Sequence, residues 1–254
     1  MKNETVVFIT VRTASTRLPN KALLQINNTP MLVLLIKRIS NIKNSRVLVC
    51  TTTEKSDDDL AKYLESEKID VFRGSNEDIL DRLYNAANHF NTDKFVVVEA
   101  DDLFCDTKLI EKTWETLSNT NYEFISWTDL PIGTSPVGIK INKLKTLIEK
   151  KKSSNTETGW IQFILDSDLF NNLVIKNPNS LLYRPDVRLT IDYTEDYELA
   201  KKLYEKLPEV FSLIDIIELL DENPKWIKIN ESVKEKYILN FKEKMITEQI
   251  SDKI

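Results

Sequence analysis

Short apolar segments alternate with segments of helical periodicity along the first half of the chain. Four runs rich in β-branched residues are too short for helices and predict buried strands at residues 6–10, 46–51, 70–73 and 95–99. Amphipathic segments between them predict helices at residues 30–40, 57–68, 76–90 and 106–118. Ser56, Ser75 and Asp106 are the expected N-caps. This alternation predicts an α/β fold, a Rossmann-like three-layer domain around a mainly parallel sheet.

The pattern changes near residue 122. Strands are predicted at residues 122–127 and 137–142, and residues 150–186 form an irregular stretch. A strand–turn–helix unit is predicted at residues 187–207, and two more helices at residues 212–220 and 232–249. We therefore expect an α/β nucleotide-binding domain over residues 1–207, with an insertion at about 125–180 for an acceptor or a dimer interface. Residues 208–254 are expected to form a helical C-terminal extension.

The composition excludes several kinds of site. Among 254 residues there are four glycines, two cysteines and one histidine. Neither a GxGxxG loop nor a P-loop can be written with so few glycines, and the cysteines form no CxxC motif or disulfide framework. His89 falls within a predicted helix, where a surface or helix-end position is expected rather than a catalytic one.

Charge and hydropathy indicate the setting of the protein. The net charge of −5 provides no global field for nucleic acid, so we expect no nucleic-acid partner. No apolar run approaches the ~20 residues of a membrane span, and the N-terminus lacks the pattern of a signal peptide. We expect a cytoplasmic protein without membrane contact.

A basic loop follows the first predicted strand. Arg12, Arg17 and Lys21 lie within ten residues of each other, together with the hydroxyl groups of Thr13, Ser15 and Thr16. Arginine offers a planar fork of donors and lysine a mobile point charge, and both suit phosphate. We interpret the loop as a triphosphate clamp built from side chains; the alternative is a solvated basic loop.

Two aspartates follow predicted strands further along. Asp101 comes after residues 95–99, and Asp192 ends the segment RLTID. Carboxylates at strand ends suit Mg²⁺, which takes one or two carboxylates plus substrate phosphates. The alternatives are capping roles, including a capping box between Asp192 and Glu195.

A further cluster surrounds Gly74, where the backbone could approach a ligand closely. Ser75 and Asp78 form a predicted capping box, and Arg82 could pair with Asp78 at i,i+4.

Taken together, these segments resemble the cytidylyltransferases of the spore coat polysaccharide biosynthesis F type, relatives of the synthetases of CMP-activated sugar acids. The resemblance rests on VRTASTRLPNKALLQINNTPML, VLVCTTTEKSDDDLAKYLESEKIDVFRGSNEDILDRLYNAA, VVVEADDLFCDTKLI and VRLTIDYTEDYELAKKLY. It implies a nucleotidyltransferase fold and Mg²⁺-dependent transfer of CMP from CTP, with release of pyrophosphate, in surface glycan biosynthesis. The implied acceptor is an acidic sugar, or a phosphate or phosphonate, and the resemblance also suggests a homodimer.

The resemblance implies a role for each matching residue. Arg12, Lys21, Asp101 and Asp192 would be catalytic, with Asp101 and Asp192 as metal ligands. The implied nucleotide-binding residues are Arg12, Ser15, Arg17, Lys21, Thr51, Thr52, Arg73, Gly74, Ser75 and Asp101.

The sequence departs from the family pattern at Ala100, where a glycine is usual, and at Asp102-Leu103 and Tyr193-Thr194, where a proline is usual.

Two alternative functions stay open. One is a glycosyltransferase, because Glu99-x-Asp101 resembles a degenerate DxD metal motif; the other is a nucleotide-binding regulatory domain without catalysis. The RLPxK loop favours the nucleotidyltransferase over the first, and the retained charged residues count against the second.

Overall fold

The protein is built around one twisted sheet of seven strands. The structure is a computed structural model that describes residues 4–15, 17–234, 236–237 and 239. The strand order is β5-β4-β1-β6-β8-β7-β9, and β8 alone of these strands runs antiparallel to its neighbours. The predicted α/β fold with a mainly parallel sheet is confirmed.

The bounds of the elements follow the predicted pattern in the first half of the chain. The strands are β1 (Thr5–Thr10), β4 (Ser45–Thr52), β5 (Asp70–Gly74), β6 (Lys94–Glu99), β7 (Phe124–Thr128), β8 (Val137–Lys140) and β9 (Asn172–Lys176). A small hairpin pairs β2 (Gln25–Ile26) with β3 (Thr29–Pro30). The helices are α1 (Met31–Ser40), α2 (Asp58–Ser66), α3 (Ile79–His89), α4 (Thr107–Asn119), α5 (Leu144–Lys150), α6 (Trp160–Asp166), α7 (Thr194–Tyr204) and α8 (Leu213–Glu222).

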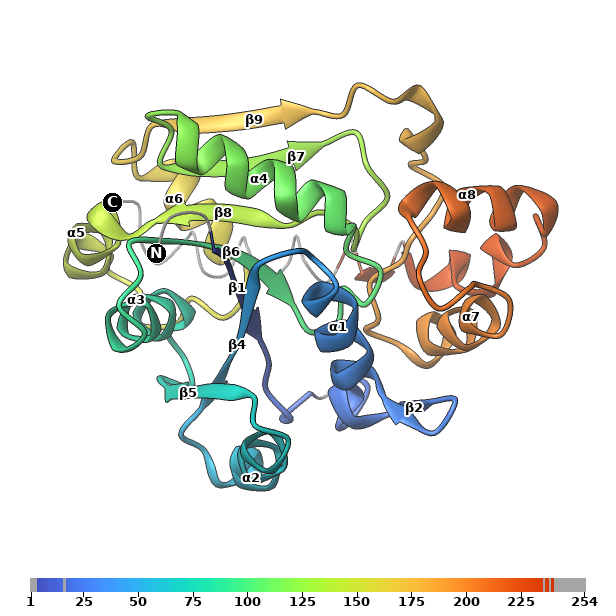
Figure 1. The fold of residues 1–254 in the computed structure, drawn as a ribbon, viewed down its shortest axis with the longest axis horizontal. Coiled ribbons are helices and arrows are strands. Elements are labelled where there is room, and N and C mark those ends of the chain that lie inside the picture. Colours follow the sequence, from blue (N-terminus) through green and yellow to red (C-terminus); the bar gives the residue numbers. More distant parts are fainter. Residues whose placement is uncertain (1–3, 16, 235, 238, 240–254) are drawn as a thin grey trace.

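Two hydrophobic cores cover the two faces of the sheet. Successive side chains of a strand point to opposite faces, and in β1 the residues Val7 and Ile9 enter one core while Val6 and Phe8 enter the other. Helices α1, α2, α4, α7 and α8 contribute to the first core, and α3, α5 and α6 to the second. Helices α7 and α8 lie together at one end of the molecule (Figure 1). The predicted three layers are therefore present.

The second half of the chain differs from the prediction in its details. The strand predicted near residue 187 is reduced to a single bridge between Ile132 and Arg188. The stretch 150–186, predicted as irregular, contains α6 and β9. Residues 125–180, predicted as an insertion, supply β7, β8 and β9 to the main sheet. The helix predicted at 232–249 lies mostly outside the described residues.

Two of the three predicted N-caps are also different. Asp106 caps α4 as predicted, accepting from Lys108 N at 2.8 Å. Helix α3 is capped by Asp78 rather than Ser75, because the chain turns once more before it becomes helical. Helix α2 follows Asp57 rather than Ser56, after the short 3-10 turn η2 (Lys55–Asp57).

Both cysteines are predicted to be chemically inert in the native protein. Cys50 and Cys105 are free and fully buried, and burial raises the pKa of the Cys50 thiol to about 12. The thiolate is the reactive form, so a thiol reagent at pH 8 should label neither residue in native protein and both after unfolding. Rapid labelling of one thiol without unfolding would contradict this packing.

Among the residues that the structure describes, none of the helices combines the length and the apolar character that a membrane span requires.

Candidate functional site

The predicted acids meet at the carboxyl ends of β1 and β6. These strands are parallel neighbours, so the loop after β1 and the turn after β6 leave the sheet at the same edge. Lys21, in the 3-10 turn η1 (Lys21–Leu23), donates hydrogen bonds to Asp101 Oδ2 and, at 2.8 Å, to Asp192 Oδ1. The two candidate metal ligands thus converge on a single cationic group.

Asp192 is the most heavily neutralised acid of this cluster. It is 2% exposed and accepts from Arg17 at 2.7 Å and from Arg188 at 3.1 Å, besides its bond with Lys21. Burial alone would raise the pKa of Asp192, but these cations outweigh it and the pKa is lowered. Asp192 is therefore an anionic anchor to which the basic loop is attached.

A buried network orients Arg188 behind Asp192. Arg188 is 1% exposed and its Nε donates to Asp196 Oδ1 at 3.0 Å; Asn230 donates to the same oxygen at 2.8 Å. Asp196 also accepts from the backbone N–H groups of Asp192 and Tyr193, so the capping partner at the start of α7 is Asp196. The alternative interpretation of Asp192, a capping box with Glu195, is therefore wrong, and the Asp192 carboxylate faces the basic loop.

Asp101 belongs to a compact group of three acids. Carboxylate oxygens of Glu99, Asp101 and Asp102 all lie within 4.8 Å of one another. Burial and the charge of Asp101 raise the pKa of Glu99 to about 7 and also raise the pKa of Asp102, and Trp160 Nε1 donates to Glu99 at 2.9 Å. Burial and the mutual repulsion of these closely spaced carboxylates both disfavour their charged forms, and a divalent cation would favour the charged forms.

Arg12 lies apart from these acids, next to Glu157. Their charged atoms are 3.7 Å apart, and the other oxygen of Glu157 is 2.6 Å from Arg82 Nη2. Arg82 is 1% exposed and donates to Ser75 O at 2.7 Å, whereas Asp78 pairs with Lys151 at 2.5 Å. The predicted i,i+4 pair between Arg82 and Asp78 is therefore wrong, because Arg82 turns into the protein toward Glu157.

The residues implied for the base pocket lie at the ends of β4 and β5. Thr51 and Thr52 are buried, and their hydroxyl groups donate to Asp57. Arg73 Nε donates to Thr52 O at 2.8 Å, which ties the two strand ends together. Gly74 ends β5, where an added Cβ would lie 2.9 Å from Phe72 Cε1.

The structure brings Arg17, Lys21, Asp101 and Asp192 together and holds Arg12 and the β4 end in separate contacts. Ser15, in the basic loop that carries Arg17 and Lys21, is half-buried. The roles in binding and catalysis stay predictions.

Several residues of the site were not predicted from the sequence. Glu157 and Trp160 come from the stretch 150–186, which was predicted as irregular, so no predicted element placed their side chains at the site. Arg188 could have been found, because it is one of eight arginines and lies four residues before Asp192. Asp57 follows a run of three threonines, but it was expected only as the first residue of a helix capped by Ser56.

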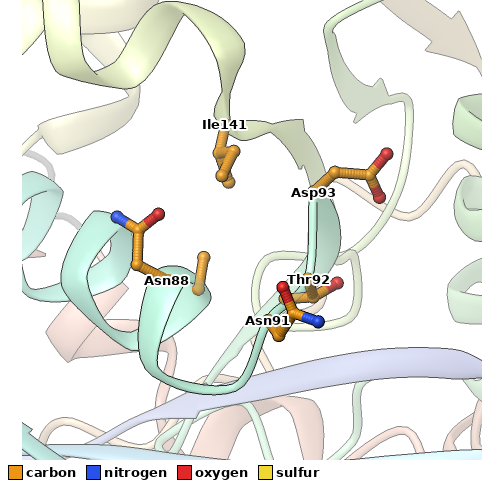
Figure 2. A pocket seen from close by; sticks show the side chains of 6 residues that line it. Asn88, Asn91, Thr92, Asp93 and Ile141 are labelled. Carbon is orange, nitrogen blue, oxygen red and sulfur yellow. The ribbon is translucent and has the colours of Figure 1, made fainter.

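A surface depression lies at the opposite end of β6 from the acids. It is lined by Ala87, Asn88, Asn91, Thr92, Asp93 and Ile141, as Figure 2 shows. Thr92 and Asp93 directly precede β6, whereas Asp101 follows it. The depression is therefore separate from the candidate site.

Comparison with known proteins connects this geometry to a family. The family model described as Cytidylyltransferase matches residues 6–218. An uncharacterized protein of Methanocaldococcus jannaschii is 31% identical over 90% of this chain and 95% of its own length. The spore coat polysaccharide biosynthesis protein SpsF of Bacillus subtilis is 26% identical over 87% of this chain and 96% of its own length. The 3-deoxy-manno-octulosonate cytidylyltransferase of Aeromonas salmonicida is 27% identical over 58% of each chain.

A solved structure agrees with these relatives. The cytidylyltransferase from Leptospira borgpetersenii superposes with a TM-score of 0.78 and is 27% identical. The match covers 88% of this chain and 96% of that one. The similarity in fold therefore extends over nearly the whole of both proteins.

Proposed function

Because this chain belongs to the cytidylyltransferase family, we propose that it transfers CMP from CTP to an acidic sugar and releases pyrophosphate. Membership of the family implies nucleotidyltransferase activity, and the relatives include proteins named for polysaccharide and sugar-acid activation. The observation that carries the proposal is the convergence of Asp101 and Asp192 on Lys21 at the end of the sheet. Surface glycan biosynthesis is the proposed context.

The residues fit a magnesium ion. Asp101 and Asp192 already share one cation, the Lys21 ammonium, and one carboxylate oxygen from each of Glu99, Asp101 and Asp102 lies within 4.8 Å of the other two. Carboxylate oxygens are the ligands that Mg²⁺ prefers, so these two residues would hold it. When bound, the ion would neutralise charge on the α-phosphate in the displacement.

The side chains of the basic loop would handle the leaving group. The acceptor oxygen forms a bond to the α-phosphorus, the bond from that phosphorus to the bridging oxygen of the β-phosphate breaks, and the acceptor's proton, where it has one, passes to solvent. Arg17 and Lys21 lie beside Asp192, where they would receive the charge of the departing pyrophosphate. Arg12, 39% exposed, would add a third cation from the edge of the loop. Preorganised cations of this kind act by positioning and electrostatics.

The leaving group, rather than the acceptor, distinguishes nucleotidyl transfer from glycosyl transfer. A phosphate or phosphonate oxygen would serve the same displacement. A glycosyltransferase would use a nucleotide diphosphate sugar and release no pyrophosphate, so it would not need three cations around a leaving pyrophosphate. The cationic loop therefore favours nucleotidyl transfer.

Nucleotide preference gives a direct test of the proposal. In the presence of Mg²⁺, CTP at about 100 times its Kd should stabilise the protein by ~2.7 kcal/mol, which for a chain of this size raises the Tm by roughly 5–10 °C. ATP, GTP and UTP should give smaller shifts in the same thermal-shift assay. Equal shifts for all four nucleotides would contradict a preference for CTP.

A further inference from the structure

Asp57 joins two segments that are far apart in the sequence. Its side chain is 0% exposed and accepts hydrogen bonds from Thr13, in the loop after β1, and from Thr51 and Thr52, at the end of β4. The first segment is the basic loop and the second is the strand end implied in binding the base. One carboxylate thus lies between the two halves of the proposed nucleotide site.

Each oxygen of the carboxylate serves one segment. Asp57 Oδ1 accepts from Thr13 N at 2.8 Å and from Thr13 Oγ1 at 2.6 Å. Asp57 Oδ2 accepts from Thr51 Oγ1 at 3.0 Å, Thr52 N at 3.2 Å and Thr52 Oγ1 at 2.5 Å. Because both oxygens are bonded to the same carbon, the distance between the two segments is fixed by covalent geometry.

Capping of the helix does not explain these bonds. Asp57 occupies the N-cap position of α2, where an aspartate ordinarily accepts from the first helical N–H groups. Its side chain makes no such bond and points away from α2, toward Thr13 in the basic loop and Thr52 at the end of β4. Burial alone would raise the pKa of Asp57, yet the hydrogen bonds from the threonines lower it, so the carboxylate is charged at neutral pH.

The two segments lead to the functional side chains. Thr13 directly follows Arg12, and the same loop continues to Arg17 and Lys21. Thr52 O accepts from Arg73, so a shift of the β4 end would also displace β5. A change in the Asp57 contacts would therefore alter the spacing between the phosphate-binding cations and the base-binding edge.

We propose that Asp57 is a positioning residue that sets the phosphate-binding loop at a fixed distance from the base-binding ends of β4 and β5. This inference rests on the proposed function, because it assigns the two segments to one nucleotide. Asp57 itself lies behind both segments, so it acts through Thr13, Thr51 and Thr52 rather than by contact with the nucleotide.

Asp57→Asn removes the tie with little change in volume. Each oxygen accepts a backbone N–H, so the amide NH₂ of asparagine would face a donor in either orientation. We expect the Kd for CTP with Mg²⁺, measured by calorimetry on folded protein without acceptor, to rise ten- to a hundredfold. Thr13→Val should give a smaller rise, and Thr13→Ser, which keeps the hydroxyl, should retain near-native affinity.

Thr113→Val is the matched control. Thr113 is also 0% exposed and its hydroxyl accepts from Trp127 at 2.8 Å, but it lies on α4, away from the loop and the β4 end. The control should lose stability without a change in the Kd for CTP, which separates positioning from a merely structural role. Native affinity in folded Asp57→Asn and Thr13→Val proteins would overturn the inference, whereas failure of the wild-type protein to bind CTP would overturn the proposed function itself.

Discussion

Replacing Asp101 with alanine is expected to lower kcat about a thousandfold while the free energy of unfolding changes by no more than about 1 kcal/mol. The catalytic loss follows from removing a proposed metal ligand. The small effect on stability follows from the neighbouring acids. Burial and, after it, the charge of Asp101 raise the pKa of both Glu99 and Asp102, so removal of Asp101 relieves repulsion. Lys21 keeps Asp192 as a partner.

The measurement combines steady-state release of pyrophosphate with chemical denaturation. Asp93→Ala is the matched control, because Asp93 precedes the same strand at its opposite end (Figure 2). It should leave kcat unchanged. Near-native turnover in the Asp101→Ala protein would remove Asp101 from the proposed metal site.

Asp192→Ala is expected to abolish activity and also to destabilise the protein by ~3 kcal/mol. The alanine leaves Arg188, which is 1% exposed, with one acidic partner fewer, and breaking a buried ion pair is costly. The pKa of Asp192 is lowered in the folded protein, so its stabilising effect is complete above the unfolded value of ~3.9 and is lost as pH falls through the folded value. The variant should therefore show a weaker fall in stability below pH 4.

Asp186→Ala provides the comparison for this prediction. Asp186 pairs with Arg184 in the same segment, but its side chain is 49% exposed, and exposed pairs contribute ~1 kcal/mol or less. A loss of stability at Asp192 no greater than that at Asp186 would contradict the anchoring role. The contrast between Asp101 and Asp192 separates an acid held mainly for function from one that also supports the fold.

The first half of the fold and the charged cluster could be predicted because their signals are local. The β-branched run before Thr10 and the one before Glu99 mark buried parallel strands, and the carboxyl ends of such strands meet at one edge. Asp101 and Asp192 were therefore expected at one edge of the sheet, whereas the contact of Lys21 with both acids was not predicted. The family resemblance is confirmed by the match over residues 6–218.

The rest depends on contacts that no local pattern encodes. Asp57 was expected in the first turn of a helix capped by Ser56, and no local pattern indicates that the fold brings Thr13, 44 positions away in the sequence, against it. The predicted pair between Arg82 and Asp78 does not form, because Arg82 pairs with Glu157 instead. Glu157 lies 75 positions away in the sequence and shares the buried environment of Arg82. Residues 187–192 keep a strand-like sequence, but they lie at the end of the sheet and form only one bridge.

Asp101, Asp192 and the basic loop are proposed to transfer CMP from CTP to an acidic acceptor. The most direct test of this proposal is incubation of the wild-type protein with CTP, Mg²⁺ and a panel of acidic sugars and phosphate- or phosphonate-bearing acceptors. Pyrophosphate would be quantified and the products identified by mass spectrometry. We predict one CMP-linked acceptor for each pyrophosphate released, with both products formed about a thousandfold more slowly by Asp101→Ala. Tight binding of CTP without a CMP-linked product from any acceptor would contradict the account.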